Sequence, residues 1–528
     1  MTTGAQETSA ASALHPTTAS RATPDARFLG PLLPASVFLS GGVVMVLEVL
    51  GTRLIAPVYG TSMHVWSALI AVTLLSLSVG YWLGGMLSDR RPHAATYFLL
   101  FEIAALMIVA LPLVRAPVLV WTQVFGLRGG ALVAAIVLLG APLTVLGMVS
   151  PFAVRLGTSV VASVGTTAGR LYAISTAGSL LGTLLAGFYL IPSFRARTLF
   201  LACAATLVLP ALLFQALHAR RHLWVAGAVL ALAALTLLFP TRTSAEVVYL
   251  EDSHFGQIKI VDEGSFRTML VNGTLQGRIV RDSHETVMTY PPALAELAWR
   301  ANPDGRWALV IGLGAGVLPP LFESFHVRSR AVEIDPAVVA AAEEYFGFDP
   351  RRVPVDVADG RQVLRQLDQR FDYIVLDAFG GEVVPPHLLT REMMELVDAR
   401  LRPGGVVLVN FVATRTGPDA RTLEALVATV ATSFPHVKVY PAGREGEFGN
   451  NLIVAKREPW ELRSGLSPVP VRPEVRSEAR LRPPLEVAAG GLVLTDDFNP
   501  IEVWSLPDQE TWRTMVLDWV ASDVLLAE

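Results

Sequence analysis

Glycines and a carboxylate with the spacing of a nucleoside-binding sheet occur shortly after residue 306. An apolar run ends in Gly312-x-Gly314-x-Gly316, and a second apolar run, about one strand-and-helix unit later, ends in Glu333. In doubly wound sheets such glycines let the backbone approach a ligand at a helix N-terminus, and the carboxylate accepts hydrogen bonds from ribose hydroxyls. The spacing therefore predicts a site for an adenosine nucleoside.

Two further acidic residues end apolar runs later in the same region. Asp359-Gly360 follows in VDVADGRQVL, and Asp377 follows in FDYIVLDAF. A glycine loop alone fits NAD equally well, so it does not identify the ligand. The two further acidic residues at predicted strand ends, Asp359 and Asp377, favour S-adenosylmethionine or its decarboxylated form over NAD.

Strands and helices must alternate around these residues to bring the strand ends together. Residues 307–455 predict a mostly parallel Rossmann-like α/β sheet covered on both faces. Residues 246–280 predict a small β-domain before it, because Asn272-Gly273 between two strand-like runs is a strong hairpin signal. A Pro- and Arg-rich linker (457–490) and an amphipathic helix near 508–526 follow.

The first half of the chain has a membrane protein's composition. The 528 residues are 52% hydrophobic, and charged residues are scarce between 32 and 240. A span needs about 20 apolar residues. Seven segments qualify and predict a polytopic α-helical membrane domain: 32–57, 64–87, 94–114, 130–152, 168–191, 196–218 and 221–240.

Several classes of partner and site are disfavoured. A net charge of −4 without a basic patch does not favour nucleic acid, and Cys203 as the single cysteine offers neither a disulfide nor a cysteine metal site. No metal is predicted. The first 27 residues, rich in Ser, Thr and Ala, suggest a disordered cytoplasmic tail rather than a cleaved signal peptide.

Glu48, Arg53 and Glu102 are ionisable residues within the predicted spans. Charges are costly in hydrocarbon and are a hint of function. Either they pair with one another or with Arg115, or they form a path for a cationic substrate.

Orientation arguments conflict. Arginines in the loops mildly favour an inside N-terminus. An odd number of spans would then place the C-terminal domain outside, away from its cofactor. Either residues 116–127 complete another crossing or one predicted span does not cross. The cofactor argument places the domain in the cytoplasm of a multi-pass cell-membrane protein.

The C-terminal half resembles the spermidine synthase (polyamine aminopropyltransferase) family, in the version with an N-terminal multi-span membrane domain. Six motifs of the family have counterparts here. They are L-x-L-D-G-x-x-Q at 269–276, Y-H-E at 283–285, G-G-G-D-G at 312–316, V-E-I-D at 332–335, D-[GA] at 359–360 and D-[ST]-[ST]-D-P at 377–381.

The resemblance implies roles for individual residues in transferring an aminopropyl group to an amine such as putrescine. Asp377 would accept the amine proton. The residues implied on the substrate side are His284 and Gln276. Those implied for decarboxylated S-adenosylmethionine are Gln257, Gly312, Gly314, Gly316, Glu333, Asp335, Asp359 and Gly360.

Three departures affect the amine side more than the nucleoside side. Ser283 replaces the motif tyrosine, Ala315 replaces the aspartate of the glycine loop, and Gly380 replaces the second aspartate of the catalytic loop. Asp496 and Asp497, in the acidic turn 494–500, are predicted either to fold over the crevice and restore negative charge or to form a solvated turn or helix cap.

Three functions remain open: an aminopropyltransferase of polyamine biosynthesis, a methyltransferase using intact S-adenosylmethionine, and a membrane protein that senses nucleosides or polyamines without turnover. A homodimer is also left open. The predicted organisation is a tail (1–27), a membrane domain (28–240), a small β-domain (241–300), a catalytic domain (301–456) and a C-terminal segment (457–528).

Overall fold

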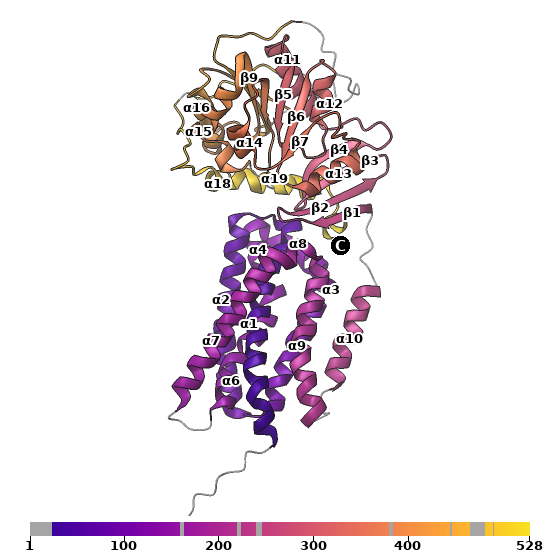
Figure 1. Ribbon diagram of the computed structural model, residues 1–528, viewed down its shortest axis with the longest axis vertical. Helices are drawn as coiled ribbons and strands as arrows, with labels where there is room; N and C mark the ends of the chain where they lie inside the picture. Colours follow the sequence, from indigo (N-terminus) through magenta and orange to yellow (C-terminus); the bar gives the residue numbers. More distant parts are fainter. Residues whose placement is uncertain are drawn as a thin grey trace, which may run out of the picture.

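A computed structural model describes residues 24–158, 163–218, 223–238, 245–379, 384–443, 446–464, 481–488 and 490–527. A bundle of apolar helices carries an α/β unit at one of its ends (Figure 1). The predicted tail lies outside the described residues up to position 23, and the first helix begins at Pro24.

Each of the seven predicted apolar segments is helical over its described residues. The helices are α1 (Pro24–Tyr59), α2 (Met63–Arg90), α3 (Ala94–Thr122), α4 (Gly126–Ala135), α5 (Ala141–Gly147), α6 (Val149–Gly157), α7 (Val164–Leu185), α8 (Ile191–Ser193), α9 (Ala196–His218) and α10 (Leu223–Leu238), with π-helical turns η2 (Ile136–Gly140) and η4 (Ala186–Leu190). Five continuous runs are long and apolar enough to cross a membrane, by length and composition. One of them, Ala94–Gly157, reverses direction near Gly126, which has a φ of 71°.

Small residues let α1 and α7 approach closely. A side chain at Gly178 would collide with the carbonyl oxygen of Phe38, and one at Gly182 would collide with that of Gly42. Close backbone approach through small residues is typical of helix pairs in membranes.

The start of α1 and the α/β unit lie at opposite ends of the bundle (Figure 1). Residues 116–127 do not provide an extra crossing, because they form the end of α3 and the turn into α4. The extra crossing considered from the sequence is therefore absent, and whether every predicted span crosses stays a prediction.

The α/β core is a seven-stranded sheet in the order β10-β11-β9-β8-β5-β6-β7. Five of its strands are parallel: β5 (Trp307–Ile311), β6 (Arg328–Glu333), β7 (Val355–Val357), β8 (Phe371–Leu376) and β9 (Leu401–Thr414). The other two, β10 (His436–Pro441) and β11 (Phe448–Lys456), form an antiparallel edge. The predicted, mostly parallel sheet is confirmed.

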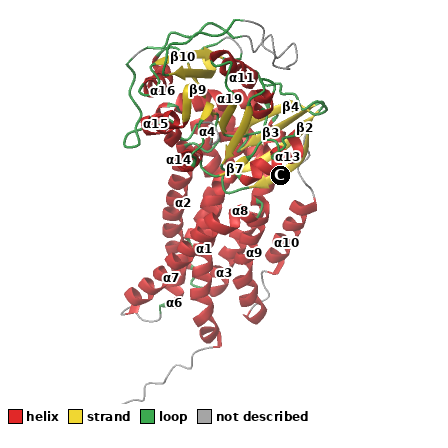
Figure 2. Ribbon diagram, turned by 45° about the horizontal axis from the view of Figure 1, so that its top comes forward, coloured by secondary structure: helices red, strands yellow, loops and turns green. Residues whose placement is uncertain are grey.

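Helices cover both faces of this sheet (Figure 2). Leu309 and Ile311 of β5 pack on one side with α14 (Gly360–Gln366), α15 (Arg391–Arg400) and α16 (Arg421–Ala431). Ala308 and Val310 pack on the other with α11 (Tyr290–Ala301) and α12 (Leu318–Glu323). Both faces of β5 are buried, which accounts for its continuous apolar sequence.

The small β-domain is an antiparallel sheet of β1 (Glu246–Asp252), β2 (Gln257–Glu263), β3 (Phe266–Val271) and β4 (Thr274–Val280). Asn272 and Gly273 connect β3 to β4 with φ values of 52° and 74°. Two positive φ angles in a two-residue turn are the geometry that Asn-Gly favours, so the predicted hairpin is present.

The C-terminal helices α18 (Ile501–Trp504), α19 (Leu506–Trp519) and α20 (Ser522–Leu526) lie between the α/β unit and the bundle (Figure 1). From α19, the buried Arg513 donates to the carbonyl oxygens of Pro57 in α1 and Asn272. The ammonium of Lys259 donates to the carbonyl oxygens of Val524, Leu525 and Ala527. These contacts tie the end of the chain to both parts of the molecule.

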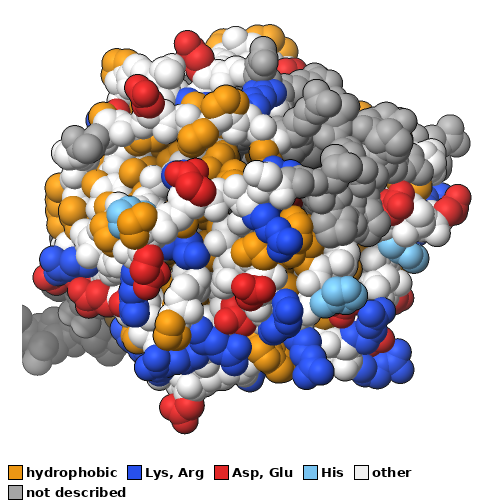
Figure 3. Space-filling model, turned by 90° about the horizontal axis from the view of Figure 1, so that it is seen from above, with side chains coloured by type: hydrophobic (Ala, Val, Ile, Leu, Met, Phe, Trp, Pro, Cys, Tyr) orange, Lys and Arg blue, Asp and Glu red, His pale blue; other side chains and the backbone are white. Residues whose placement is uncertain are grey.

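The two ends of the molecule differ in surface chemistry. Viewed from the α/β end, charged side chains of both signs are spread over the surface (Figure 3). The sides of the bundle expose large apolar side chains, including Leu74, Trp82, Leu180 and Phe188. This contrast is expected for a bundle surrounded by lipid and a domain in water.

Candidate active site

A cavity of about 500 Å³ lies at the carboxyl ends of β5 and β8. The chain runs outward from β5 through β6 to β7 and then crosses to β8 on the other side of β5. Open α/β sheets bind ligands in the crevice at such a reversal of strand order. The glycine loop after β5 and Asp377 after β8 both line the cavity.

Glu333, the last residue of β6, presents its carboxylate to the cavity and organises the backbone around it. One oxygen accepts a 3.0 Å hydrogen bond from the Leu313 N–H and the other a 3.1 Å bond from the Asp335 N–H. Burial raises the pKa of Glu333, and these two hydrogen bonds act in the opposite direction. Each oxygen keeps a lone pair that can accept from a ribose hydroxyl.

Asp359 lines the cavity and caps α14. Its Oδ1 accepts from the Gln362 N–H at 2.9 Å, and its Oδ2 lies 2.7 Å from His387 Nε2. Burial alone would raise the pKa of Asp359, but the hydrogen bonds from Gln362 and His387 outweigh it and lower the pKa. Together with Pro385 and Leu388, these residues line one wall of the cavity.

Asp377, directly after β8, is a cavity carboxylate held by two side-chain donors. Its Oδ1 accepts a 2.8 Å hydrogen bond from Asn410, and its Oδ2 accepts a 3.2 Å bond from the Tyr290 hydroxyl. Asn450 donates to the Asn410 oxygen and so fixes that amide with its NH₂ toward Asp377. Burial raises the pKa of Asp377 to about 7, against the lowering effect of the two donors. A carboxylate with this pKa can both accept and release a proton at neutral pH.

The glycine loop passes close to Asp377. At Gly312 the φ is 99°, and a Cβ atom there would collide with the carbonyl oxygen of Asp377. Glycine is therefore required for the loop and the β8 strand end to share one cavity. The glycine loop, Glu333, Asp359 and Asp377 therefore line one continuous cavity.

A loop of the small β-domain covers the nucleoside side, and a bundle helix holds it. Ser253 donates to Asp335 at 2.5 Å, and its oxygen accepts from the Phe255 and Gly256 N–H groups. From α1, Arg53 donates to the Ser253 carbonyl oxygen at 2.9 Å and lies 3.6 Å from Asp252. Arg53 itself lines the cavity.

Two other ionisable residues noted in the sequence, Arg115 and Glu102, have partners within the bundle, and Glu48 is not among the described residues that line the cavity. Arg115 donates to the Leu54 carbonyl oxygen at 2.8 Å, and Glu102 accepts a hydrogen bond from Gln215. Of the groups noted in the sequence, Arg53 is the one that reaches the cavity.

The structure brings together many of the predicted site residues. Those that line the cavity are Gln276, Gly312, Gly314, Glu333, Asp335, Asp359 and Asp377.

The other predicted site residues are not among the described residues that line the cavity. Gln257 donates to Asp252, the exposed His284 packs against Gly347, and a side chain on Gly316 would meet Phe348. Gly360 begins α14, where a side chain would collide with Ile311, so its role is packing.

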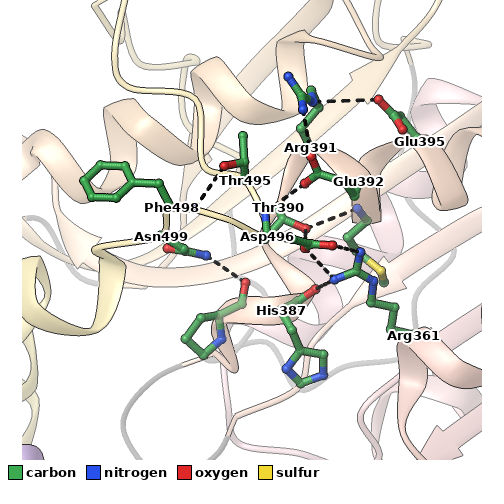
Figure 4. Close-up of polar contacts among 12 residues, drawn as sticks. Arg361, His387, Thr390, Arg391, Glu392, Glu395, Thr495, Asp496, Phe498 and Asn499 are labelled. Atoms are coloured by element: carbon green, nitrogen blue, oxygen red, sulfur yellow. Dashed lines mark hydrogen bonds and ion pairs between the residues drawn. The ribbon is translucent and has the colours of Figure 1, made fainter.

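The acidic turn 494–500 bears on the two alternatives left open by the sequence (Figure 4). Asp496 accepts two hydrogen bonds from Arg361, at 2.7 and 2.6 Å, and one from Thr390 at 2.8 Å. The Arg361 guanidinium lowers the pKa of Asp496. The carboxylate is already paired outside the cavity, and Asp497 is exposed. This placement runs against the prediction that the turn supplies negative charge to the crevice.

Asp496 instead supports the pocket wall beside Asp359. Arg361 also donates to the His387 carbonyl oxygen at 3.1 Å, and His387 contacts Asp359. We expect Asp496→Asn to weaken binding of methylthioadenosine by about tenfold or less, because the buried Arg361 loses its charged partner. Asp497→Asn, one residue away, should leave binding unchanged. Equal affinities in titrations of both variants would show that the pair does not position the wall.

The structure describes one of two positions, Ala315 and Gly380, at which the sequence departs from the family pattern. Ala315 is buried, and a side chain at Gly277 of β4 would collide with it. It lies outside the described cavity lining, so the lost aspartate does not open space there. Gly380 falls outside the described residues.

Sequence reasoning missed four residues of the site: Arg53 as a cavity residue, Tyr290, His387 and Asn410. Asn410 had a usable signal, because it is a polar residue inside the apolar run VVLVNFV. Arg53 was noted as a charge in a span, but its contact with the Ser253 loop was not predicted.

Known proteins match the C-terminal half. Residues 288–440 match the family model described as spermine/spermidine synthase domain. A polyamine aminopropyltransferase of Vibrio vulnificus is 31% identical over 232 residues, covering 42% of this chain and 75% of that protein. An N-terminal histidine N-methyltransferase of Emericella nidulans is 30% identical over 236 residues, covering 39% and 41%. The crystal structure of a probable spermidine synthase from Corynebacterium glutamicum aligns with a TM-score of 0.38 at 21% identity, covering 48% of this chain and 97% of that one.

Proposed function

Because this chain belongs to the spermine/spermidine synthase family of transferases, we propose that it transfers an aminopropyl group from decarboxylated S-adenosylmethionine to an amine. The observation that carries the proposal is Asp377. Its carboxylate lies in the same cavity as Glu333 and Asp359, and its pKa of about 7 suits proton transfer from an amine.

The reaction needs little from the protein beyond positioning and proton removal. The co-substrate supplies a methylene carbon bonded to a sulfonium. The amine nitrogen forms a bond to that carbon, the carbon–sulfur bond breaks with its electrons going to sulfur, and Asp377 takes the proton released from nitrogen. Tyr290 and Asn410 hold the carboxylate in one orientation, which raises the fraction of productive encounters.

Ligand-induced stabilisation of the full-length protein in detergent tests the cofactor part of this proposal. Decarboxylated S-adenosylmethionine and methylthioadenosine should raise the melting temperature more than intact S-adenosylmethionine does. A ligand at a hundred times its Kd adds about 2.7 kcal/mol, which is enough to rank the three. A preference for intact S-adenosylmethionine would favour methyl transfer instead.

The replacement of the motif aspartate by Ala315 bears on the methyltransferase alternative, because it removes a partner for the amine of the decarboxylated co-substrate and could make room for the carboxylate of intact S-adenosylmethionine. The packing of Ala315 against Gly277 removes the second of these arguments. The sensor alternative predicts binding without turnover, and it gives no reason for a carboxylate buried between two donors at Asp377.

We also propose that the bundle anchors the enzyme in a membrane with the α/β unit in the cytoplasm, where the nucleoside is made. Arginines at the opposite end, such as Arg90 and Arg91, favour the reverse orientation. In a Cys203→Ala background, a membrane-impermeant maleimide applied to intact cells should label His93→Cys and spare Asp497→Cys until the membrane is opened. The opposite labelling pattern would place the domain outside.

A further inference from the structure

The helical bundle forms one wall of the active-site cavity. The α/β unit sits directly on the bundle end at which α1 finishes and α2 begins (Figure 1). The cavity residues contributed by α1, α2, the turn between them, η4 and α8 are Val49, Thr52, Arg53, Ala56, Thr61, Trp66, Gly187, Ile191 and Pro192.

This wall is mostly apolar, with Arg53 as its one described charge. A second ammonium group on the acceptor would meet either an apolar surface or the guanidinium of Arg53, and both are unfavourable. The other cavity carboxylates, Glu333, Asp335 and Asp359, line the glycine-loop side proposed for the nucleoside, where they accept hydrogen bonds from backbone N–H groups, Ser253 and His387. The cavity therefore fits one reacting amine and an uncharged, apolar remainder.

A second hollow continues from this wall toward the outside. It measures about 480 Å³ and shares Thr61, Trp66 and Pro385 with the active-site cavity. Its other lining residues include Met63 of α2 and Val503 of α18, both more than half exposed. Trp66 lines both spaces and is 43% exposed. Tryptophan is common at membrane–water interfaces, so this opening lies where an amphiphile would enter.

We propose that the acceptor is an amphiphilic primary amine that enters from the bundle side, with its nitrogen at Asp377 and its apolar chain against α1, α2 and α8. The inference rests on the proposed aminopropyl transfer and names the substrate class of that site. The bonds formed and broken are the same, and the proton again passes from nitrogen to Asp377.

A homologous series of amines tests the chain-length requirement on the full-length protein in nanodiscs of phosphatidylcholine. Butylamine, octylamine and putrescine are compared by release of methylthioadenosine from decarboxylated S-adenosylmethionine. A fully buried methylene is worth about fourfold, so four partly buried ones should raise kcat/KM for octylamine over butylamine by about tenfold or more. Replacing the lipid with phosphatidylethanolamine and looking for aminopropylated lipid distinguishes a lipid headgroup from a free amine as the source.

Two tryptophans of the same helix supply a matched pair of variants. Trp66→Ala should reduce the octylamine-to-butylamine ratio by about threefold or more, because it removes apolar wall area. Trp82→Ala, at a 66% exposed position outside the cavity lining, should leave the ratio unchanged. Turnover with putrescine but not with octylamine or lipid would overturn the inference and leave the proposed function intact. If no amine supports release of methylthioadenosine, both fail.

Discussion

Asp377→Asn should reduce turnover by roughly 10²–10⁴-fold, the usual loss when a general base is removed. The substitution preserves shape: the new amide keeps an oxygen that accepts from Asn410, and its NH₂ can donate to the Tyr290 oxygen. Binding of methylthioadenosine should therefore stay close to that of the parent. Single-turnover kinetics with decarboxylated S-adenosylmethionine and octylamine, alongside a binding titration, measure both quantities.

Asp368→Asn, at an exposed position before β8, is the matched control and should behave as the parent does. The pH profile of the parent provides a second check. Asp377 acts as a base only when ionised, so with a pKa raised to about 7 the rate should fall as the pH drops below about 7. Normal turnover by Asp377→Asn would remove this residue from the mechanism.

Glu333→Ala should abolish stabilisation by methylthioadenosine at concentrations that stabilise the parent. The change removes the acceptor for the ribose hydroxyls, and each such buried bond left unmade costs about 1–3 kcal/mol. It also leaves the N–H groups of Leu313 and Asp335 without their carboxylate partner. The measurement is the melting temperature with and without ligand.

The unliganded melting temperature separates loss of binding from loss of fold, because Glu333 also supports the glycine loop. Glu333→Asp keeps the charge and should retain part of the ligand effect, while Glu343→Ala, on the exposed face of α13 (Pro336–Phe346), should retain all of it. Full stabilisation of Glu333→Ala by the nucleoside would contradict the ribose assignment.

The parts of the site that could be predicted are those encoded locally. The apolar runs before Gly312, Glu333 and Asp377 identify buried parallel strands, and parallel strands carry their end residues to one edge of the sheet. Asn272-Gly273 specifies its own turn in the same way, because the two residues tolerate the required φ angles.

The parts that could not be predicted depend on contacts between distant segments. Asp496 pairs with Arg361, 135 residues earlier, and nothing in the acidic turn itself distinguishes that partner from a substrate amine. Arg53 reaches Ser253 from a bundle helix, so its role depends on how the α/β unit docks on the bundle. The apolar wall of the cavity depends on the same docking. The composition of the apolar helices does not indicate how the α/β unit docks on them.

The products formed by the full-length protein test the central claim most directly. The protein is incubated with a mixture of octylamine and putrescine and with either decarboxylated or intact S-adenosylmethionine, and the products are identified by mass spectrometry. The proposed function predicts methylthioadenosine and an aminopropylated amine from the decarboxylated co-substrate, and neither product with Asp377→Asn. Formation of S-adenosylhomocysteine and a methylated product from intact S-adenosylmethionine, with the decarboxylated form unused, would contradict it.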